Sequence, residues 1–245
     1  MNLKILGSSS RGNSYILESE KDILILDAGV SIATIKKAVN FDLSNVVGCL
    51  WTHQHQDHSK SILDLSKAGI NCYSSQDAVM ALTDYYNHHL LIVQPGKIYQ
   101  IGSFKILPFE VKHDVTNYGF LIDHHESGKI IYITDTYYVP YKFKGLNNIL
   151  IEANYSIDIA NEAISNGAPV AVRNRVLHSH MEISTVVDFL KANDLKEVNN
   201  IVLLHMSSGN SNAAEFKKKI QETAPGKIVT VADKNMTINL SKISF

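Results

Sequence analysis

The chain of 245 residues has no long apolar run and carries almost no net charge. No stretch approaches the roughly 20 apolar residues that a membrane-spanning helix needs, and the amino-terminal segment lacks the apolar core of a secretory signal peptide. The formal net charge of −1 excludes a global basic field. We therefore expect a cytoplasmic protein with no membrane partner. Any attraction for nucleic acid must come from a local basic patch or from bound metal.

Cysteine is also scarce. Cys49 and Cys72 both lie in apolar, strand-like stretches. A disulfide between them is one alternative, and two buried free thiols are the interpretation we favour, because unpaired cysteine is commonly buried. Apolar residues make up 45% of the chain and charged residues 19%, which is the composition of a globular protein with enough apolar side chains for a core.

Short apolar runs that end in polar or glycine residues predict strands. They cover residues 3–6, 14–17, 23–26, 46–51, 104–111, 120–122, 129–133, 149–152, 201–204, 228–231 and 236–240. Apolar residues at helical spacing predict helices over 32–39, 60–68, 184–192 and 213–222. Strands lie early and late with helices between them, so we expect an α/β fold of four layers, an αββα sandwich, formed by a single domain over residues 1–245.

Three histidines and one aspartate fall within six residues directly after the strand at 46–51. They are His53, His55, Asp57 and His58. Imidazole and carboxylate groups are the ligands that hold Zn²⁺, Mn²⁺ or Fe²⁺ in proteins. Four ligands so close together exceed what one tetrahedral metal with an open water position needs, so the spacing favours two adjacent metals. A polar surface loop that happens to be rich in histidine is the alternative.

Four more residues of ligand type each stand at the end of an apolar run. They are Asp27, His113, Asp135 and His205. The carboxyl ends of strands that meet at one edge of a sheet are where sites assemble in layered α/β folds. We therefore expect these side chains to gather beside the histidine loop.

The order of these residues resembles the signature of the metallo-β-lactamase superfamily, from Gly7 to His205. The resemblance implies two divalent metal ions, Zn²⁺ or Mn²⁺ with Fe²⁺ as an alternative, held by the seven residues His53, His55, His113, Asp57, His58, His205 and Asp135. The first three of these would bind one metal and the next three the other, with Asp135 bridging both. Asp27 would orient the histidine loop without touching metal.

Within the superfamily, segments 7–15, 151–155 and 205–207 resemble the YycJ (WalJ)-type bacterial and phage proteins, which are regarded as exonuclease-like. The loop at 176–184 resembles that branch's Gly-His-Leu-Ser-Asn segment and puts His180 at the family histidine. Ser179 stands where glycine is usual, and Glu182 is a second departure.

In the mechanism that the resemblance implies, two metals ~3.5–4 Å apart share a water and lower its pKa toward neutrality. We expect Asp135, Asp57 and His180 to be catalytic. Asp135 would orient the nucleophile, and His180 would act as a phosphate-oxygen donor or as general acid, with His178 as the alternative for that role.

Three further features stay open between function and structure. The loop at 8–13 is either a phosphate-binding turn or a plain tight turn. Arg173 and Arg175 either guide a phosphate backbone or are solvated charges. Tyr137, Tyr138 and Tyr141 either stack a base or pack. The adjacent pairs at 88–89 and 124–125 are expected to point apart and not to bind metal.

Our leading hypothesis is a metal-dependent phosphodiesterase, a 5'-3' exonuclease-like nuclease acting on nucleic acid. A small-molecule hydrolase of the same fold, acting on a cyclic phosphodiester, thioester or lactone, is the second hypothesis, and a deep, narrow pocket would favour it. A di-iron redox or sensor protein usually needs a flavin domain, for which the chain has no room. A catalytically idle binding module is disfavoured because every ligand position is retained.

Overall fold

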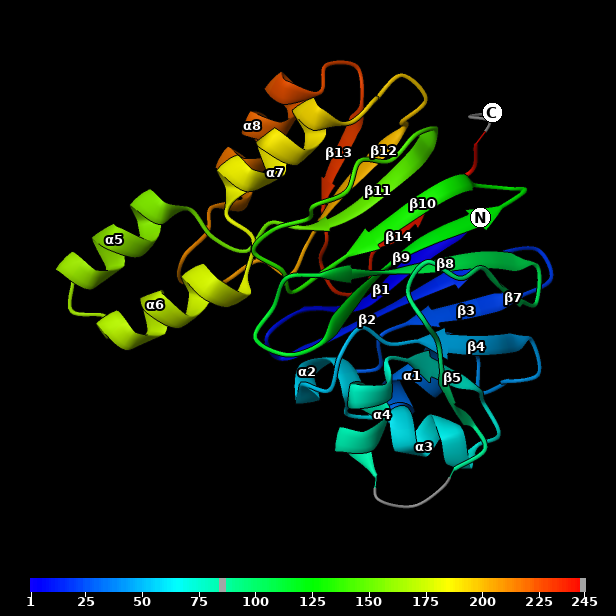
Figure 1. Ribbon diagram of the computed structural model, residues 1–245. Helices are drawn as coiled ribbons and strands as arrows, with labels where there is room; N and C mark the ends of the chain where they lie inside the picture. The colour runs from blue at the N-terminus through cyan, green and yellow to red at the C-terminus, as the bar shows by residue number, and fades with distance from the viewer. Residues whose placement is uncertain (84–86, 243–245) are drawn as a thin grey trace.

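Two sheets form the centre of the protein (Figure 1). In the computed structural model, which describes residues 1–83 and 87–242, each sheet has seven strands. Sheet I has the strand order β14-β1-β2-β3-β4-β5-β6, and sheet II has the order β13-β12-β11-β10-β9-β8-β7. The strands of sheet I are β1 (Asn2–Ser9), β2 (Gly12–Glu18), β3 (Ile23–Leu26), β4 (Val46–Leu50), β5 (Cys72–Ser74), β6 (Leu90–Ile92) and β14 (Thr237–Asn239). Those of sheet II are β7 (Tyr99–Ile101), β8 (Phe104–Val111), β9 (Asn117–His124), β10 (Gly128–Ile133), β11 (Leu146–Glu152), β12 (Asn200–Leu204) and β13 (Ile228–Val231).

Parallel strands lie in both sheets. Strands β3 to β6 pair in parallel in sheet I, and strands β10 to β13 pair in parallel in sheet II. Every residue of β11 and β12 is buried, as expected for parallel strands that are covered on both faces. The carboxyl ends of several strands therefore meet at one edge of each sheet.

Helices cover the outer face of each sheet. The helices of the described residues are α1 (Ile32–Ala38), α2 (Gln56–Ser59), α3 (Ile62–Lys67), α4 (Gln76–Leu82), α5 (Ile157–Ser165), α6 (Val170–Ser179), α7 (Ile183–Ala192) and α8 (Ala213–Thr223), of which α5 and α6 lie off the sheets (Figure 1). One apolar cluster fills the space between the sheets, a second packs α1, α3 and α4 on sheet I, and a third packs α7 and α8 on sheet II. The predicted four-layer α/β sandwich is confirmed.

Helices α5 and α6 form a hairpin that extends away from the two sheets (Figure 1). It has its own small apolar cluster of Tyr155, Ala160 and Val176. The carboxyl end of α6 returns to the body of the protein at Ser179, so the hairpin leads directly into His180.

Most predicted elements are confirmed, with shifted ends. The predicted helix over 60–68 is wrong at its start, because helix α2 begins at Gln56 and helix α3 follows at Ile62. The predicted loop over 176–184 is also wrong, since its first residues form the last turn of α6 and its last residues begin α7. Cys49 and Cys72 are buried free thiols, as expected, and face each other in register across β4 and β5. None of the described helices is long and apolar enough to cross a membrane.

Candidate metal centre

The ligand-type residues predicted from the sequence come together at the carboxyl ends of the strands. The histidine loop follows β4 and runs into α2, so Asp57 and His58 lie in the first turn of that helix. His113 comes soon after β8, Asp135 follows β10 and His205 follows β12. Among the described residues, three groups of potential ligand atoms form here, each within 4.8 Å, and all three contain Asp135. Two of them consist wholly of metal ligands predicted from the sequence, and the third joins Asp135 and His205 to Glu152 and His180.

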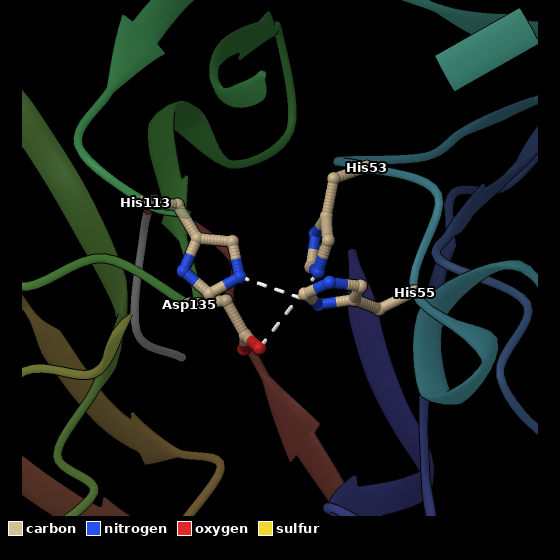
Figure 2. Close-up of side chains that lie close together, drawn as sticks. All are labelled: His53, His55, His113 and Asp135. Carbon is tan, nitrogen blue, oxygen red and sulfur yellow. Dashed lines mark hydrogen bonds and ion pairs between the residues drawn. The ribbon is translucent and has the colours of Figure 1, made fainter. Parts of the chain in front are cut away.

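The first group consists of His53, His55, His113 and Asp135 (Figure 2). His55 Nδ1 lies 3.4 Å from His113 Nε2, and His53 Nε2 lies 3.9 Å from the Asp135 carboxylate. His113 Nδ1 lies 2.8 Å from the backbone carbonyl of Ser179, which can only accept. His113 therefore carries its proton on Nδ1 and keeps a free lone pair on Nε2, the atom that faces the other imidazoles.

The second group consists of Asp57, His58, Asp135 and His205. His58 Nε2 lies 3.2 Å from Asp135 Oδ1 and 3.6 Å from Asp57 Oδ2. His205 Nε2 also lies 3.6 Å from Asp57 Oδ2. The side-chain amide of Asn13, on β2, donates to His58 Nε2 at 3.1 Å and holds that ring in place.

Two buried nitrogens test whether metal fits here. Among the described residues, His53 Nε2 and His205 Nε2 have no hydrogen-bond partner. A buried polar atom left unpaired costs about 1–3 kcal/mol, so such atoms persist where something else satisfies them. One of these nitrogens belongs to each group, and neutral imidazole with carboxylate is a donor set for divalent transition metals. The residues present therefore fit a pair of divalent cations.

A buried carboxylate behind the histidine loop orients it. Asp27 accepts hydrogen bonds from the Tyr132 hydroxyl at 2.5 Å, from His58 Nδ1 at 2.7 Å and from the backbone N–H of Thr52 at 2.8 Å. The bond to His58 favours a proton on Nδ1 of that ring and a lone pair on Nε2, which contacts the Asn13 amide here and is the atom that could bind a metal. The segment after Asp27 packs its backbone directly against α2. A Cβ added at Gly29 would lie 1.7 Å from the backbone oxygen of Asp57, so there is no room for a side chain at this position.

Burial and neighbouring charges oppose each other at the histidines. Burial, and then the neighbouring His58, lower the pKa of His53 well below its ordinary value. At His205 burial also lowers the pKa, but the carboxylates of Asp135 and Glu152 outweigh it and raise the pKa to about 10. Burial raises the pKa of Asp135, yet the His205 and His58 rings hold it well below its usual range. The negative charge gathered at the second group therefore favours either a bound cation or a protonated His205.

Glu152, at the end of β11, is a functional candidate that our reading of the residues missed. Its side chain is fully buried, and Oε1 lies 2.6 Å from His180 Nδ1 and 3.0 Å from His205 Nδ1. The other oxygen accepts from the backbone N–H groups of Thr136 and Met181. Glu152 ends an apolar run just as Asp135 and His205 follow theirs, so the strand-end pattern itself was the signal that could have found it.

His180 lies in the cavity at the metal groups, and His178 does not. The cavity has a volume of about 380 Å³ and is lined by Ser10, His55, Gln56, Asp57, His113, Asp114, Asp135, Arg175, Ser179 and His180. Burial lowers the pKa of His180, but the Glu152 carboxylate outweighs it and raises the pKa above the ordinary value. His178 is exposed on α6.

The remaining sequence candidates separate clearly. Arg175 is exposed and lines the cavity, whereas Arg173 donates to Asn161 Oδ1 at 3.0 Å. Ser8 lies in β1, and its hydroxyl accepts from the backbone N–H of His205 at 2.9 Å. The loop at 8–13 therefore supports the site, and its Ser10 reaches the cavity.

The adjacent histidine pairs do not point apart as expected. The ring centroids of His88 and His89 are 4.2 Å apart, and those of His124 and His125 are 4.3 Å apart. The expected geometry is therefore wrong at both pairs. His124, His125 and Glu126 bring ligand-type atoms within 4.8 Å of one another, while the Glu126 carboxylate pairs with the amino-terminal amine at 2.8 Å. That neither histidine pair binds metal stays a prediction.

Comparison with known proteins places these features in context. A family model described as "Beta-lactamase superfamily domain" matches residues 23–206. The chain is 25% identical to exodeoxyribonuclease YycJ of Bacillus anthracis, over 86% of this chain and 84% of that one. It is also 25% identical to exodeoxyribonuclease WalJ of Streptococcus pneumoniae, over 90% and 93% of the two chains. The structure of the metallo-β-lactamase fold protein YhfI from Bacillus subtilis superposes with a TM-score of 0.73, at 16% identity over 97% of this chain and 99% of that one.

Proposed function

Because the chain belongs to the β-lactamase superfamily and is a hydrolase of that fold, we propose that it is a two-metal phosphodiesterase. In this proposal it degrades nucleic acid as a 5'-3' exonuclease-like enzyme. The observation that carries the proposal is the pair of ligand groups that share Asp135. The names of the two similar exodeoxyribonucleases support nucleic acid as the substrate. The two free thiols are in keeping with a cytoplasmic protein, and we take residues 1–245 to act as one domain.

In this proposal each metal is Zn²⁺ or Mn²⁺. His53, His55 and His113 would hold one ion, Asp57, His58 and His205 would hold the other, and Asp135 would bridge them. When bound, such a pair lowers the pKa of water toward neutrality and neutralises charge on phosphate oxygens.

His180 is the general acid of the proposed reaction. Its Nδ1–H is held by Glu152 at 2.6 Å, and that carboxylate favours the protonated ring by raising its pKa. The ring lines the cavity, where it can donate a proton to the leaving oxygen of a phosphodiester. Asp57 has a side chain 23% exposed and lines the same cavity, so its carboxylate can accept a hydrogen bond from the attacking water.

Arg175 gives the cavity its attraction for phosphate. It is the one Lys or Arg side chain among the described residues that line this cavity, whose lining also includes the carboxylates of Asp57, Asp114 and Asp135. A guanidinium at this point suits a phosphate next to the scissile one. The 380 Å³ volume, however, lies at the small end for ligand sites, and this observation favours a hydrolase of a small phosphodiester as the second candidate function.

Elemental analysis followed by a cleavage assay tests the proposal. Purified protein is supplemented with Mn²⁺ or Zn²⁺ and incubated with end-labelled oligonucleotides, in parallel with a small diester such as bis-p-nitrophenyl phosphate. We expect two metals per chain and products that shorten stepwise from the 5' end. Cleavage of the small diester alone would favour the second candidate. Alanine at His55 or Asp135 should abolish cleavage while the circular dichroism spectrum is retained, and unchanged activity would reject the metal mechanism.

His180→Ala separates catalysis from metal binding. Loss of the general acid should reduce the rate by about 100-fold or more while the metal content stays at the wild-type level. His178→Ala, two residues earlier in the last turn of α6 and outside the cavity, is the matched control and should retain the wild-type rate. If the His180 variant loses metal, His180 is a metal ligand and not the general acid. If instead the His178 variant is slow and the His180 variant is not, His178 is the general acid.

A further inference from the structure

A second cavity lies on the outer side of sheet II, between the loop that follows β10 and helix α7. Its volume is about 310 Å³. Tyr138, Tyr141, Met181 and Phe189 provide aromatic and apolar parts of its wall, and the side chains of Lys142 and Asp188 add polar groups. Small-molecule sites of about 300 Å³ and upward have this composition, with mostly apolar walls and a few polar groups.

The tyrosines of this loop are displayed rather than packed. Tyr138 is 53% exposed and Tyr141 is 43% exposed, whereas Val139, between them in the sequence, is buried in the core. Tyr141 contacts Phe109 edge to face, with ring centroids 5.7 Å apart, and this contact holds its ring in place. The packing interpretation of these tyrosines therefore fails for Tyr138 and holds only in part for Tyr141.

The loop is fixed to the candidate metal centre. Tyr138 follows Asp135 by three residues, so their Cα atoms are at most ~11 Å apart. The hydroxyl oxygen of Thr136 lies 2.7 Å from the backbone oxygen of Lys112 and 2.9 Å from that of Tyr138, so its one proton can bond either of them. The backbone N–H of Thr136 donates to Glu152. On the other wall of the cavity, Met181 directly follows His180. The cavity is thus within reach of a nucleotide adjoining a phosphodiester bound at Asp135 and His180.

We propose that this cavity is a nucleobase-binding subsite, in which a base of the nucleic-acid substrate stacks on Tyr138 and Tyr141. The inference rests on the proposed function and names a part of the substrate that the metal groups do not contact. Aromatic rings accept any base, because every base has a π face, so the subsite would bind without strict sequence preference. A volume of about 310 Å³ suits one base with part of its sugar rather than a larger ligand.

Binding of oligonucleotides with one missing base tests the subsite. The probes are fluorescein-labelled, phosphorothioate-linked strands of ten nucleotides, which resist cleavage, each with a single abasic site at a successive position. Affinity is measured by fluorescence polarisation in the presence of Mn²⁺. For the wild-type protein, one or two abasic positions should weaken binding by about 5- to 100-fold, the value of one stacked base.

Three variants decide the outcome. In Tyr138→Ala/Tyr141→Ala the penalty for the abasic site should disappear, and in Tyr138→Phe/Tyr141→Phe, which keeps both rings, it should remain. Tyr137→Ala is the matched control, since Tyr137 is 41% exposed on the same loop but does not line the cavity. Thermal melting shows whether each variant is folded.

The failures of the two proposals are distinguishable. A wild-type protein that neither binds nor cleaves any strand overturns the proposed function and the subsite with it. A wild-type protein that binds strands with no position-dependent abasic penalty overturns the subsite alone. The subsite alone is also overturned if the folded Tyr138→Ala/Tyr141→Ala variant keeps the affinity penalty for the abasic site, or if Tyr137→Ala loses that penalty.

Discussion

Replacing Asp27 by asparagine isolates the effect of one buried carboxylate on the histidine loop. Asp27 Oδ2 accepts from Tyr132 and from His58 Nδ1, and Oδ1 accepts from the Thr52 N–H. An asparagine replaces one of the two carboxylate oxygens with an NH₂ group, which then faces either Tyr132 and His58 or the Thr52 N–H. On that side a donor would meet a donor. If the NH₂ faces His58, that ring must carry its proton on Nε2, the nitrogen that would bind metal.

The expected result is weaker metal binding in a folded protein. Loss of a partner that orients a ligand typically costs 10- to 100-fold in metal affinity, and we expect a loss in that range for Asp27→Asn. Two hydrogen bonds to a charged group are weakened as well, at about 1.5–3 kcal/mol each, so the free energy of unfolding of the metal-free protein should fall by about 3–6 kcal/mol. Urea unfolding measures the stability, and competition with a chromophoric chelator measures the affinity.

Tyr132→Phe is the matched control for this prediction. It removes one donor to Asp27 but leaves the 2.7 Å contact between Asp27 and His58 intact. The free energy of unfolding should fall by about 1.5–3 kcal/mol with little change in metal affinity. If both variants bind metal equally well, Asp27 contributes only to stability, and the argument from the proton position on His58 is refuted.

Three other measurements probe the same centre. Neighbouring carboxylates outweigh burial and raise the pKa of His205 to about 10, above its unfolded value, so a proton competes with metal for this ring at neutral pH. Chelator competition should therefore show metal affinity rising with pH, and an affinity that does not change with pH would contradict this. In Gly29→Ala the new Cβ would lie 1.7 Å from the backbone oxygen of Asp57, so metal content should fall even if the protein folds. Glu152→Gln should lower the pKa of His180. Because the general acid must be protonated, the basic limb of the kcat–pH profile should then move to lower pH. If that limb does not move, the role of Glu152 is purely structural.

The strand-end pattern explains why so much of the site could be predicted from the sequence. An apolar run followed by a single Asp or His is visible locally, and strands that run in the same direction bring such ends to one edge without any knowledge of the loops. Strands β10, β11 and β12 pair in parallel, and β8 runs in the same direction as β10 because both pair antiparallel with β9. His113, Asp135 and His205 were located in this way, although they are far apart in the sequence. The fold class followed from the same strands and from the helices between them.

Features that depend on partners distant in sequence were not visible. Asn13 is an ordinary polar residue in the sequence, and its role comes from the contact with His58 at 3.1 Å. Helix α6 was missed because it projects from the sheets in a hairpin, so no apolar stripe at helical spacing is required of it (Figure 1). Strands β5, β6 and β7 each have three residues, which is too short for a periodic signal.

The backbone at the strand ends gives a physical reason for the residue types found there. Asp27, Asp135 and His205 all have positive φ, at 55°, 50° and 48°. This left-handed conformation costs most residues on the order of 1–3 kcal/mol, and aspartate and histidine are among the few that adopt it readily. The same residues therefore offer both a side chain that could bind a cation and a backbone that tolerates the turn. Glu152 ends its strand without a positive φ, and there the longer carboxylate is compatible with the backbone. At position 135 the left-handed backbone and the proposed metal-binding role both favour aspartate, so glutamate there would keep the charge but not suit the backbone.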